Sequence, residues 1–244
     1  MKLSRQERAE RRASFRQMGF LEKLDYVFSY YKLEIVLVLV AVIVVGDIAY
    51  RQITRKEALL YSAYINISAG EDLDAALSTG FVDYVGVSGK KNEVYIYRDL
   101  YLSQDPSADN HQYAYASRLK LLASIGAKKL DVVLMNREAY DLLSQSGYLY
   151  AIPDILAQGD PLYPVLEPYM TANTVILEDN SIEYNLNEAD TYEAVSVESV
   201  NGIDVSEFPL FREAGFSDYV YLGVVGNSQR LETVFEYIAY LAAA

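Results

Sequence analysis

An uninterrupted apolar run near the N-terminus limits what this chain can fold into more than any other feature. All eleven residues from Ile35 to Val45 are apolar, which leaves no polar face for a helix at the surface of a soluble domain. The longer segment 33–50 has 18 residues and reaches roughly 27 Å as a helix, close to the thickness of a bilayer's hydrocarbon core. We therefore predict one transmembrane helix over residues 33–50.

The charges beside this segment predict its orientation. Eight Lys and Arg residues lie within residues 1–32, whereas Arg51, Arg55 and Lys56 follow the segment. The positive-inside rule then places the N-terminus in the cytoplasm and the C-terminal part outside, at the cell membrane. A cleaved signal peptide and a buried soluble helix are the alternatives. The long stretch before the run and the poor cleavage motif Asp47-Ile48-Ala49 favour an uncleaved anchor.

The regions on either side of the predicted span differ in charge and pattern. Residues 1–32 form a basic arm, and apolar residues at helical spacing within 20–31 predict an amphipathic segment along the inner membrane interface. Residues 51–57 are a predicted linker, and residues 58–244 a predicted extracytoplasmic domain. From residue 57 onward the chain has ten Lys and Arg against 28 Asp and Glu. So acidic a domain disfavours nucleic acid as a partner.

Apolar runs alternate with amphipathic segments through the predicted domain. This alternation favours an α/β fold with a mixed sheet. Strands are expected in residues 58–67, 92–102, 130–135, 148–152, 174–179, 191–199 and 218–226, and helices in residues 68–80, 111–129, 137–146 and 231–242. Gly80, Gly126 and Gly147 are predicted helix ends, and Leu119, Leu121, Leu122 and Ile125 are predicted core residues of the second helix.

Two segments carry a resemblance to a known family. The first, residues 128–156, reads "KKLDVVLMNREAYDLLSQSGYLYAIPDIL", and the second, residues 221–241, reads "YLGVVGNSQRLETVFEYIAYL". Both resemble extracellular solute-binding proteins of the periplasmic-binding-protein type. The matching positions of the first segment are Asp131, Val132, Val133, Gly147, Leu149, Ile152 and Leu156. The resemblance implies capture or sensing of a small ligand outside the cell. The domain is short for that family, which implies that one or both lobes are trimmed.

Polar residues at the ends of three predicted strands are the candidate ligand contacts. Free backbone N–H groups point toward ligands where a strand ends and a helix begins. This argument selects Asn66, Ser68, Asn136, Arg137, Asn227 and Ser228. A structural role competes at each position, because Ser68, Asn136 and either Asn227 or Ser228 also suit helix N-caps.

Signals for catalysis and for metal binding are poor. The chain has no Cys and one His, His111, which removes thiolate sites and most zinc and triad arrangements. Asp105 and Asp109 lack the spacing of a calcium-binding loop. We expect no enzyme activity, no cofactor and no bound metal. Two functions stay open, namely a small-ligand receptor and a non-catalytic envelope module with a protein partner.

Overall fold

The structure is a computed structural model of the whole chain, and it describes residues 19, 32–103, 110–180 and 191–244. The predicted amphipathic segment within residues 20–31 therefore lies outside the described residues. The chain divides into two compact units, residues 1–55 and residues 56–244. We call the second unit the domain, and the two are described separately.

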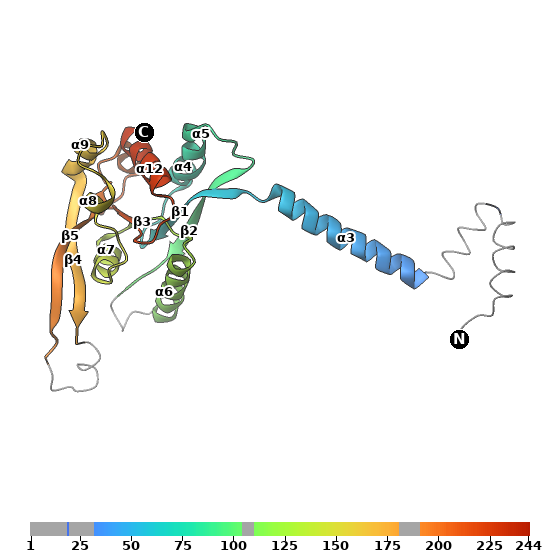
Figure 1. Cartoon of the computed structure of the whole chain (residues 1–244), viewed down its shortest axis with the longest axis horizontal. Helices are drawn as coiled ribbons and strands as arrows, with labels where there is room; N and C mark the ends of the chain where they lie inside the picture. Colours follow the sequence, from blue (N-terminus) through green and yellow to red (C-terminus); the bar gives the residue numbers. More distant parts are fainter. Residues whose placement is uncertain (1–18, 20–31, 104–109, 181–190) are drawn as a thin grey trace. The chain divides into compact units, whose positions relative to one another are not determined.

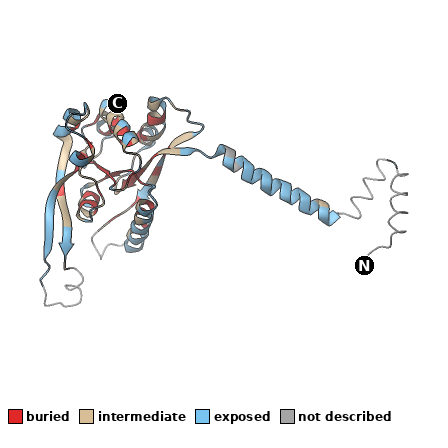
Figure 2. Cartoon of the chain, in the orientation of Figure 1, coloured by how far each residue is buried: buried red, intermediate tan, exposed pale blue. Residues whose placement is uncertain are grey.

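The first unit contains one long apolar helix, α3 (Lys32–Thr54). Its segment Lys32–Tyr50 has a mean hydropathy of 2.5 and is long and apolar enough to cross a membrane. The apolar side chains of this segment, apart from half-buried Ile35, are exposed on the helix surface (Figure 2). Such exposure is expected for a helix that lipid surrounds. Within the part of the chain that the structure describes, this is the one helix of such length and hydropathy, in agreement with the sequence prediction.

The domain is built on a six-stranded mixed sheet (Figure 1). Across the sheet the order is β2 (Asn92–Leu100), β1 (Glu57–Ile65), β3 (Val132–Met135), β6 (Tyr221–Val224), β5 (Ala194–Asp204) and β4 (Met170–Asp179). Strands β1 and β3 run parallel to each other, and β2 runs parallel to β1. Strand β6 lies antiparallel to β3, and β5 lies antiparallel to both β6 and β4. The predicted mixed α/β class is thus confirmed.

Helices cover both faces of this sheet. One face packs against α4 (Glu71–Ala75), the π-helical turn η1 (Ala76–Gly80), α5 (Phe81–Val85), α11 (Pro209–Ala214) and α12 (Leu231–Ala243). The other face packs against α6 (His111–Gly126) and α7 (Arg137–Gln145). Successive strand residues alternate between the two cores, as Tyr64 and Ile65 of β1 do. The short elements α8 (Ile152–Ile155), α9 (Tyr163–Leu166) and the 3₁₀ turn η2 (Glu167–Tyr169) lead into β4.

Two local predictions about strands and cores are wrong. Residues 148–152 do not form a strand; they make one bridge, Leu149 to Val225, before α8 begins. Pro153 explains the change, because its fixed φ and missing N–H suit the first turn of a helix. Leu119 of α6 is also not a core residue, since 49% of it is exposed.

The predicted end of the first helix is wrong as well. Gly80 does not stop it, because the helical backbone continues through η1 and α5 to Gly86, whose φ of +76° ends it. Gly80 instead permits a close approach. A Cβ there would lie 2.6 Å from the hydroxyl of Tyr240 on α12. Ser68 does not cap the helix either, since Gly70 occupies the N-cap position of α4.

Strands β4 and β5 form a long hairpin of which only one end joins the sheet (Figure 1). Strand β5 pairs with β6 through Ile203 and Asp204 alone. The remaining residues of β5 pair only with β4. We call residues 175–179 of β4 and 194–197 of β5 the hairpin arm.

Candidate functional site

The structure brings four of the six predicted contact residues to one edge of the sheet. Ile65 and Met135, the last residues of β1 and β3, pair with each other, so Asn66 and Ser68 lie at the same edge as Asn136 and Arg137. Asn136 N donates to the carbonyl of Ile65 at 3.3 Å. This edge is the carboxyl end of two parallel strands, where open α/β sheets commonly bind ligands.

Asn66 is engaged in a structural contact at this edge. Its side-chain Nδ2 donates to the carbonyl of Leu102 at 2.6 Å, and its Oδ1 accepts from the N–H of Leu102 at 2.8 Å. Its backbone φ is +58°, a left-handed conformation that asparagine tolerates better than most residues. Asn66 therefore ties the end of β1 to the end of β2. Ser68 is exposed in the following loop.

Asn136 and Arg137 begin helix α7. Asn136 Oδ1 accepts from the N–H of Ala139 at 3.0 Å, which confirms the predicted N-cap. The Arg137 guanidinium lies 2.8 Å from Asp141 and over the rings of Tyr140 and Tyr221, at 5.6 and 5.7 Å from the ring centroids. Its side chain is half exposed, so it is accessible to a ligand while it is held in place.

Asn227 and Ser228 lie at the opposite edge, away from the other four residues. Strand β6 runs antiparallel to β3, and its last residue, Val224, pairs with Val132 at the start of β3. The chain beyond β6 is therefore beside Asp131. The sequence argument grouped all three strand ends because it could not show the direction of β6.

The buried carboxylate of Asp131 organises this second edge. One of its oxygens accepts from the N–H of Tyr61 at 2.9 Å, and the other accepts from the Ser228 hydroxyl at 2.7 Å. Arg230 lies 3.3 Å away and stacks over the Tyr61 ring at 4.8 Å. Because a buried charge requires a countercharge and hydrogen bonds, Ser228 has a structural role here.

Neither Asn227 nor Ser228 caps helix α12, so that prediction is wrong. Arg230 occupies the N-cap position. Asn227 Nδ2 instead donates to the carbonyl of Ile125 at the end of α6, at 2.7 Å. The link fixes α6 to the turn after β6. It was not visible in the sequence because about a hundred residues separate the two partners.

A buried polar network fixes the base of the hairpin to α7. The Tyr140 hydroxyl lies 2.8 Å from Asn201 Oδ1 and 2.9 Å from the carbonyl of Thr171. Asn201 Nδ2 donates to Ser144 Oγ at 2.8 Å, and Ser144 Oγ donates to the carbonyl of Thr174 at 2.8 Å. Burial raises the pKa of Tyr140 well above the usual value for a phenol, so it remains a neutral donor. The sequence analysis missed this network.

Beyond this network the hairpin arm carries an apolar face. Val175 and Val197 are directly paired, and Val195 follows on the same face by the alternation of β5. Leu177 is the unpaired residue of a bulge in β4, beside Glu178, which pairs with Val195. Exposure reaches 61% for Leu177, 59% for Val195 and 47% for Val197, and the arm is drawn largely as exposed in Figure 2. The alternating segments 174–179 and 191–199 are the sequence signal for this face.

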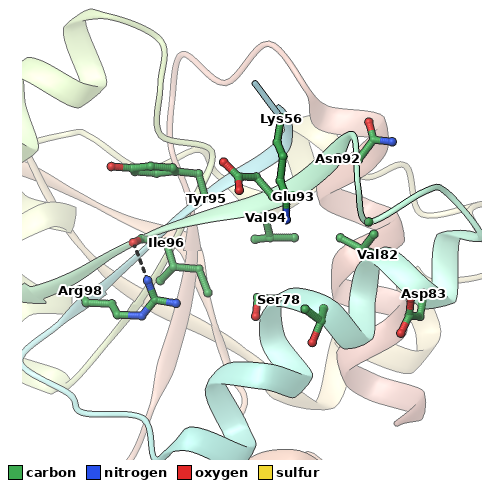
Figure 3. Close-up of a pocket in the computed structure, with 12 residues that line it drawn as sticks. Lys56, Ser78, Val82, Asp83, Asn92, Glu93, Val94, Tyr95, Ile96 and Arg98 are labelled. Carbon is green, nitrogen blue, oxygen red and sulfur yellow. Dashed lines mark hydrogen bonds between the residues drawn. The ribbon is translucent and has the colours of Figure 1, made fainter. Parts of the chain in front are cut away.

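A groove of about 390 Å³ lies between edge strand β2 and the helical segment η1–α5 (Figure 3). Apolar side chains of Val82, Val94 and Ile96 face it, and Lys56, Asp83 and Glu93 add charges around it. The sequence analysis predicted the strand and the first helix but not the groove between them.

The described residues contain no group of three or more His, Cys, Asp and Glu side chains that could hold a metal ion. His111 is the exposed first residue of α6. Asp105 and Asp109 lie outside the described residues.

Comparison with known proteins gives no match, whether to a family model, to a curated protein or to a solved structure. The arm, the groove and the carboxyl edge of the parallel strands are the three candidate binding surfaces of the domain.

Proposed function

We propose that this protein is a single-pass, membrane-anchored interaction module whose domain binds a protein partner on the extracytoplasmic side. Helix α3 is the proposed anchor. The excess of basic residues before it supports a cytoplasmic N-terminus. The proposed role of the domain is non-catalytic.

The apolar face of the hairpin arm is the observation that carries this proposal. An isolated two-stranded ribbon is marginally stable in water, yet these strands expose Leu177, Val195 and Val197 beyond the point where α7 supports them. Contiguous exposed apolar side chains mark interaction sites on soluble domains. A partner that covered the arm would remove this surface from water, which stabilises a complex by roughly 25 cal/mol for each Å² buried.

Photo-crosslinking in intact cells tests this proposal. A benzophenone amino acid is placed at Leu177 or Val197 of the full chain, and at exposed Tyr219 as the control position. We expect one discrete protein adduct from both arm positions and none from Tyr219. Addition of Val195→Lys should abolish the adduct, because a charge on the apolar face disfavours burial. Equal adducts at all three positions, or no protein adduct on the arm, would argue against the proposal.

A small-ligand receptor, the function that the resemblance to solute-binding proteins implies, is the second candidate. Two observations favour it. The groove beside β2 lies within the size range of ligand pockets. In addition, Asn66, Ser68, Asn136 and Arg137 share the carboxyl edge of β1 and β3, the usual ligand position in open α/β sheets.

A thermal-shift screen separates the two candidates. The full chain in detergent is screened against amino acids, sugars, nucleosides and divalent ions. A ligand at 100 times its Kd should stabilise the fold by about 2.7 kcal/mol. A specific shift that is weakened by Ser68→Ala, a change at an exposed position, would favour the receptor. A flat result from a cooperatively melting domain would favour the interaction module.

A further inference from the structure

Alternate residues of β2 point their backbone N–H and C=O groups away from the rest of the sheet. Strand β2 is terminal in the sheet formed by the described residues. Backbone groups of successive strand residues point alternately to the two sides of the strand. The Lys91 carbonyl accepts from Glu57 N of β1 at 2.7 Å, so the odd-numbered residues that follow face β1. Val94 and Ile96 consequently direct their N–H and C=O groups away from the sheet.

A side chain confirms this direction at one position. The Ile96 carbonyl accepts from Arg98 Nη1 at 3.4 Å, on the outer side of β2 (Figure 3). The same guanidinium makes two bonds to Asp74, at 2.9 and 2.7 Å. The Arg98 side chain therefore covers the C-terminal end of the β2 edge, next to Asp99, whose backbone is in the left-handed conformation. The stretch from Asn92 to Ile96 lines the groove.

The groove already described gives this stretch a second wall. Ser78, Thr79, Val82 and Asp83 of η1 and α5 line the side opposite β2 (Figure 3). Buried Val82 and Val94 supply an apolar floor. A peptide that adds to a sheet edge needs backbone partners on the edge strand and space for its alternate side chains. Strand β2 provides the backbone partners, and the groove with its apolar floor provides the space.

The charge of the groove and of the domain indicates which kind of polypeptide could add to β2 as a strand. Asp83, Glu93 and Lys56 line the groove, and Arg98 is compensated by its pairing with Asp74, so one acidic charge remains in excess. From residue 57 onward the chain carries a formal charge of −18, from ten basic and 28 acidic residues. A second copy of this domain would therefore be repelled, whereas a basic segment would be attracted.

We propose that an extended, basic peptide segment of a partner protein adds to β2 as a further strand. Its backbone pairs with Val94 and with the N–H of Ile96. Its apolar side chains lie over Val82 and Val94, and its basic side chains lie near Asp83 and Glu93. The inference rests on the proposed function, of which it specifies the binding mode.

Peptide selection on the full chain tests this inference. The protein in lipid nanodiscs is panned against a display library of random peptides of about ten residues. The best peptide is then synthesised in its ordinary form and with alternate backbone nitrogens methylated. Thr79→Trp fills the groove from an exposed helix position, and Ser217→Trp is the matched exposed control. Circular dichroism and melting verify that both variants fold.

We expect enriched peptides to be basic with alternating apolar residues. Thr79→Trp and backbone methylation should each weaken binding by at least about tenfold, or 1.4 kcal/mol, and Ser217→Trp should leave it unchanged. Bound peptide should slow hydrogen exchange at the amides of Val94 and Ile96. No enrichment over empty nanodiscs, equal binding to Thr79→Trp, exchange protection elsewhere, or chains that dimerise through β2 would overturn the inference. Arm-specific crosslinks obtained beside such a result would leave the proposed function standing.

Discussion

The interior of the domain depends on a few polar residues that no short-range pattern identifies. Asp131 precedes β3 and is fully buried, and its carboxylate joins β1, the turn after β6 and the start of α12. In the sequence, Asp131 is only the one polar residue of an apolar run. Its role depends on Tyr61, Ser228 and Arg230, which lie far from it in the chain.

Replacement of Asp131 should destabilise the domain strongly. Asp131→Asn removes the countercharge of Arg230. It also points the new amide N–H at the Tyr61 N–H or the Ser228 hydroxyl, which are themselves hydrogen-bond donors. We expect a loss of about 3 kcal/mol in the free energy of unfolding, measured by urea denaturation. The control Asp218→Asn, at an exposed position, should change it by less than about 0.5 kcal/mol. Equal effects of the two changes would contradict the assigned role of Asp131.

Gly202 provides a second test at the residue scale, this time of the hairpin base. A Cβ there would lie 2.5 Å from Cζ and the hydroxyl of Tyr140, and the hydrogen bonds of that hydroxyl prevent the ring from moving aside. Gly202→Ala should cost about 2 to 3 kcal/mol in unfolding free energy. Gly159→Ala, where nothing lies within 4 Å, should change stability by less than about 1 kcal/mol. A tolerated Gly202→Ala would show that the base is loosely packed.

At the scale of elements, apolar runs predicted most strands well. Single residues that commonly cap or end helices were less reliable guides to where helices begin and end. Strands β1, β2 and β3 begin and end within two residues of the predicted segments 58–67, 92–102 and 130–135. The inner strands β1 and β3 are largely apolar because both of their faces are covered, whereas edge strand β2 alternates between buried Val94 and Ile96 and exposed Tyr95. Gly80 does not end the helix; a glycine is needed there because the Tyr240 hydroxyl leaves no room for a Cβ. Ser68 failed as a cap because Gly70 begins the helix.

Strand direction was the larger obstacle for the candidate site. A strand's sequence does not state whether it runs parallel or antiparallel to its neighbours. Asn136 and Asn227 both follow apolar strands, yet β3 and β6 are antiparallel, so the two residues lie at opposite edges. The groove was equally hidden, because it forms between β2 and the segment η1–α5, and its shape depends on how they pack.

The anchor helix permits a direct test of membrane insertion. Eleven central apolar residues at roughly −0.5 kcal/mol each favour insertion by about 5 kcal/mol, whereas two central lysines oppose it by about 5 to 7 kcal/mol. The double change Val38→Lys, Val42→Lys should therefore release the protein from membranes on alkaline extraction. The matched change Val38→Leu, Val42→Leu should leave it membrane-bound. Retention of the lysine variant would contradict anchoring by α3.

At the scale of the whole molecule, an apolar N-terminal helix precedes a domain with two candidate binding surfaces. The hairpin arm offers an exposed apolar face, and the edge of β2 offers backbone groups beside an apolar floor. Neither surface contains a constellation of catalytic side chains among the described residues. Both suit recognition of another polypeptide, the arm through burial of apolar side chains and the edge through strand addition.

Cysteine labelling in intact cells tests this account most directly, because the chain has no native cysteine. Leu177→Cys reports on the arm and Ser217→Cys on a separate exposed position of the domain. In purified protein, both should react with a membrane-impermeant maleimide.

In intact cells, we expect Ser217→Cys to be labelled, since the proposed topology places the domain outside the cytoplasm. Leu177→Cys should be protected until detergent separates the partner from the arm. Two results would contradict the account. Failure to label Ser217→Cys would place the domain inside the cell, and equal labelling at both positions would show that the arm has no partner.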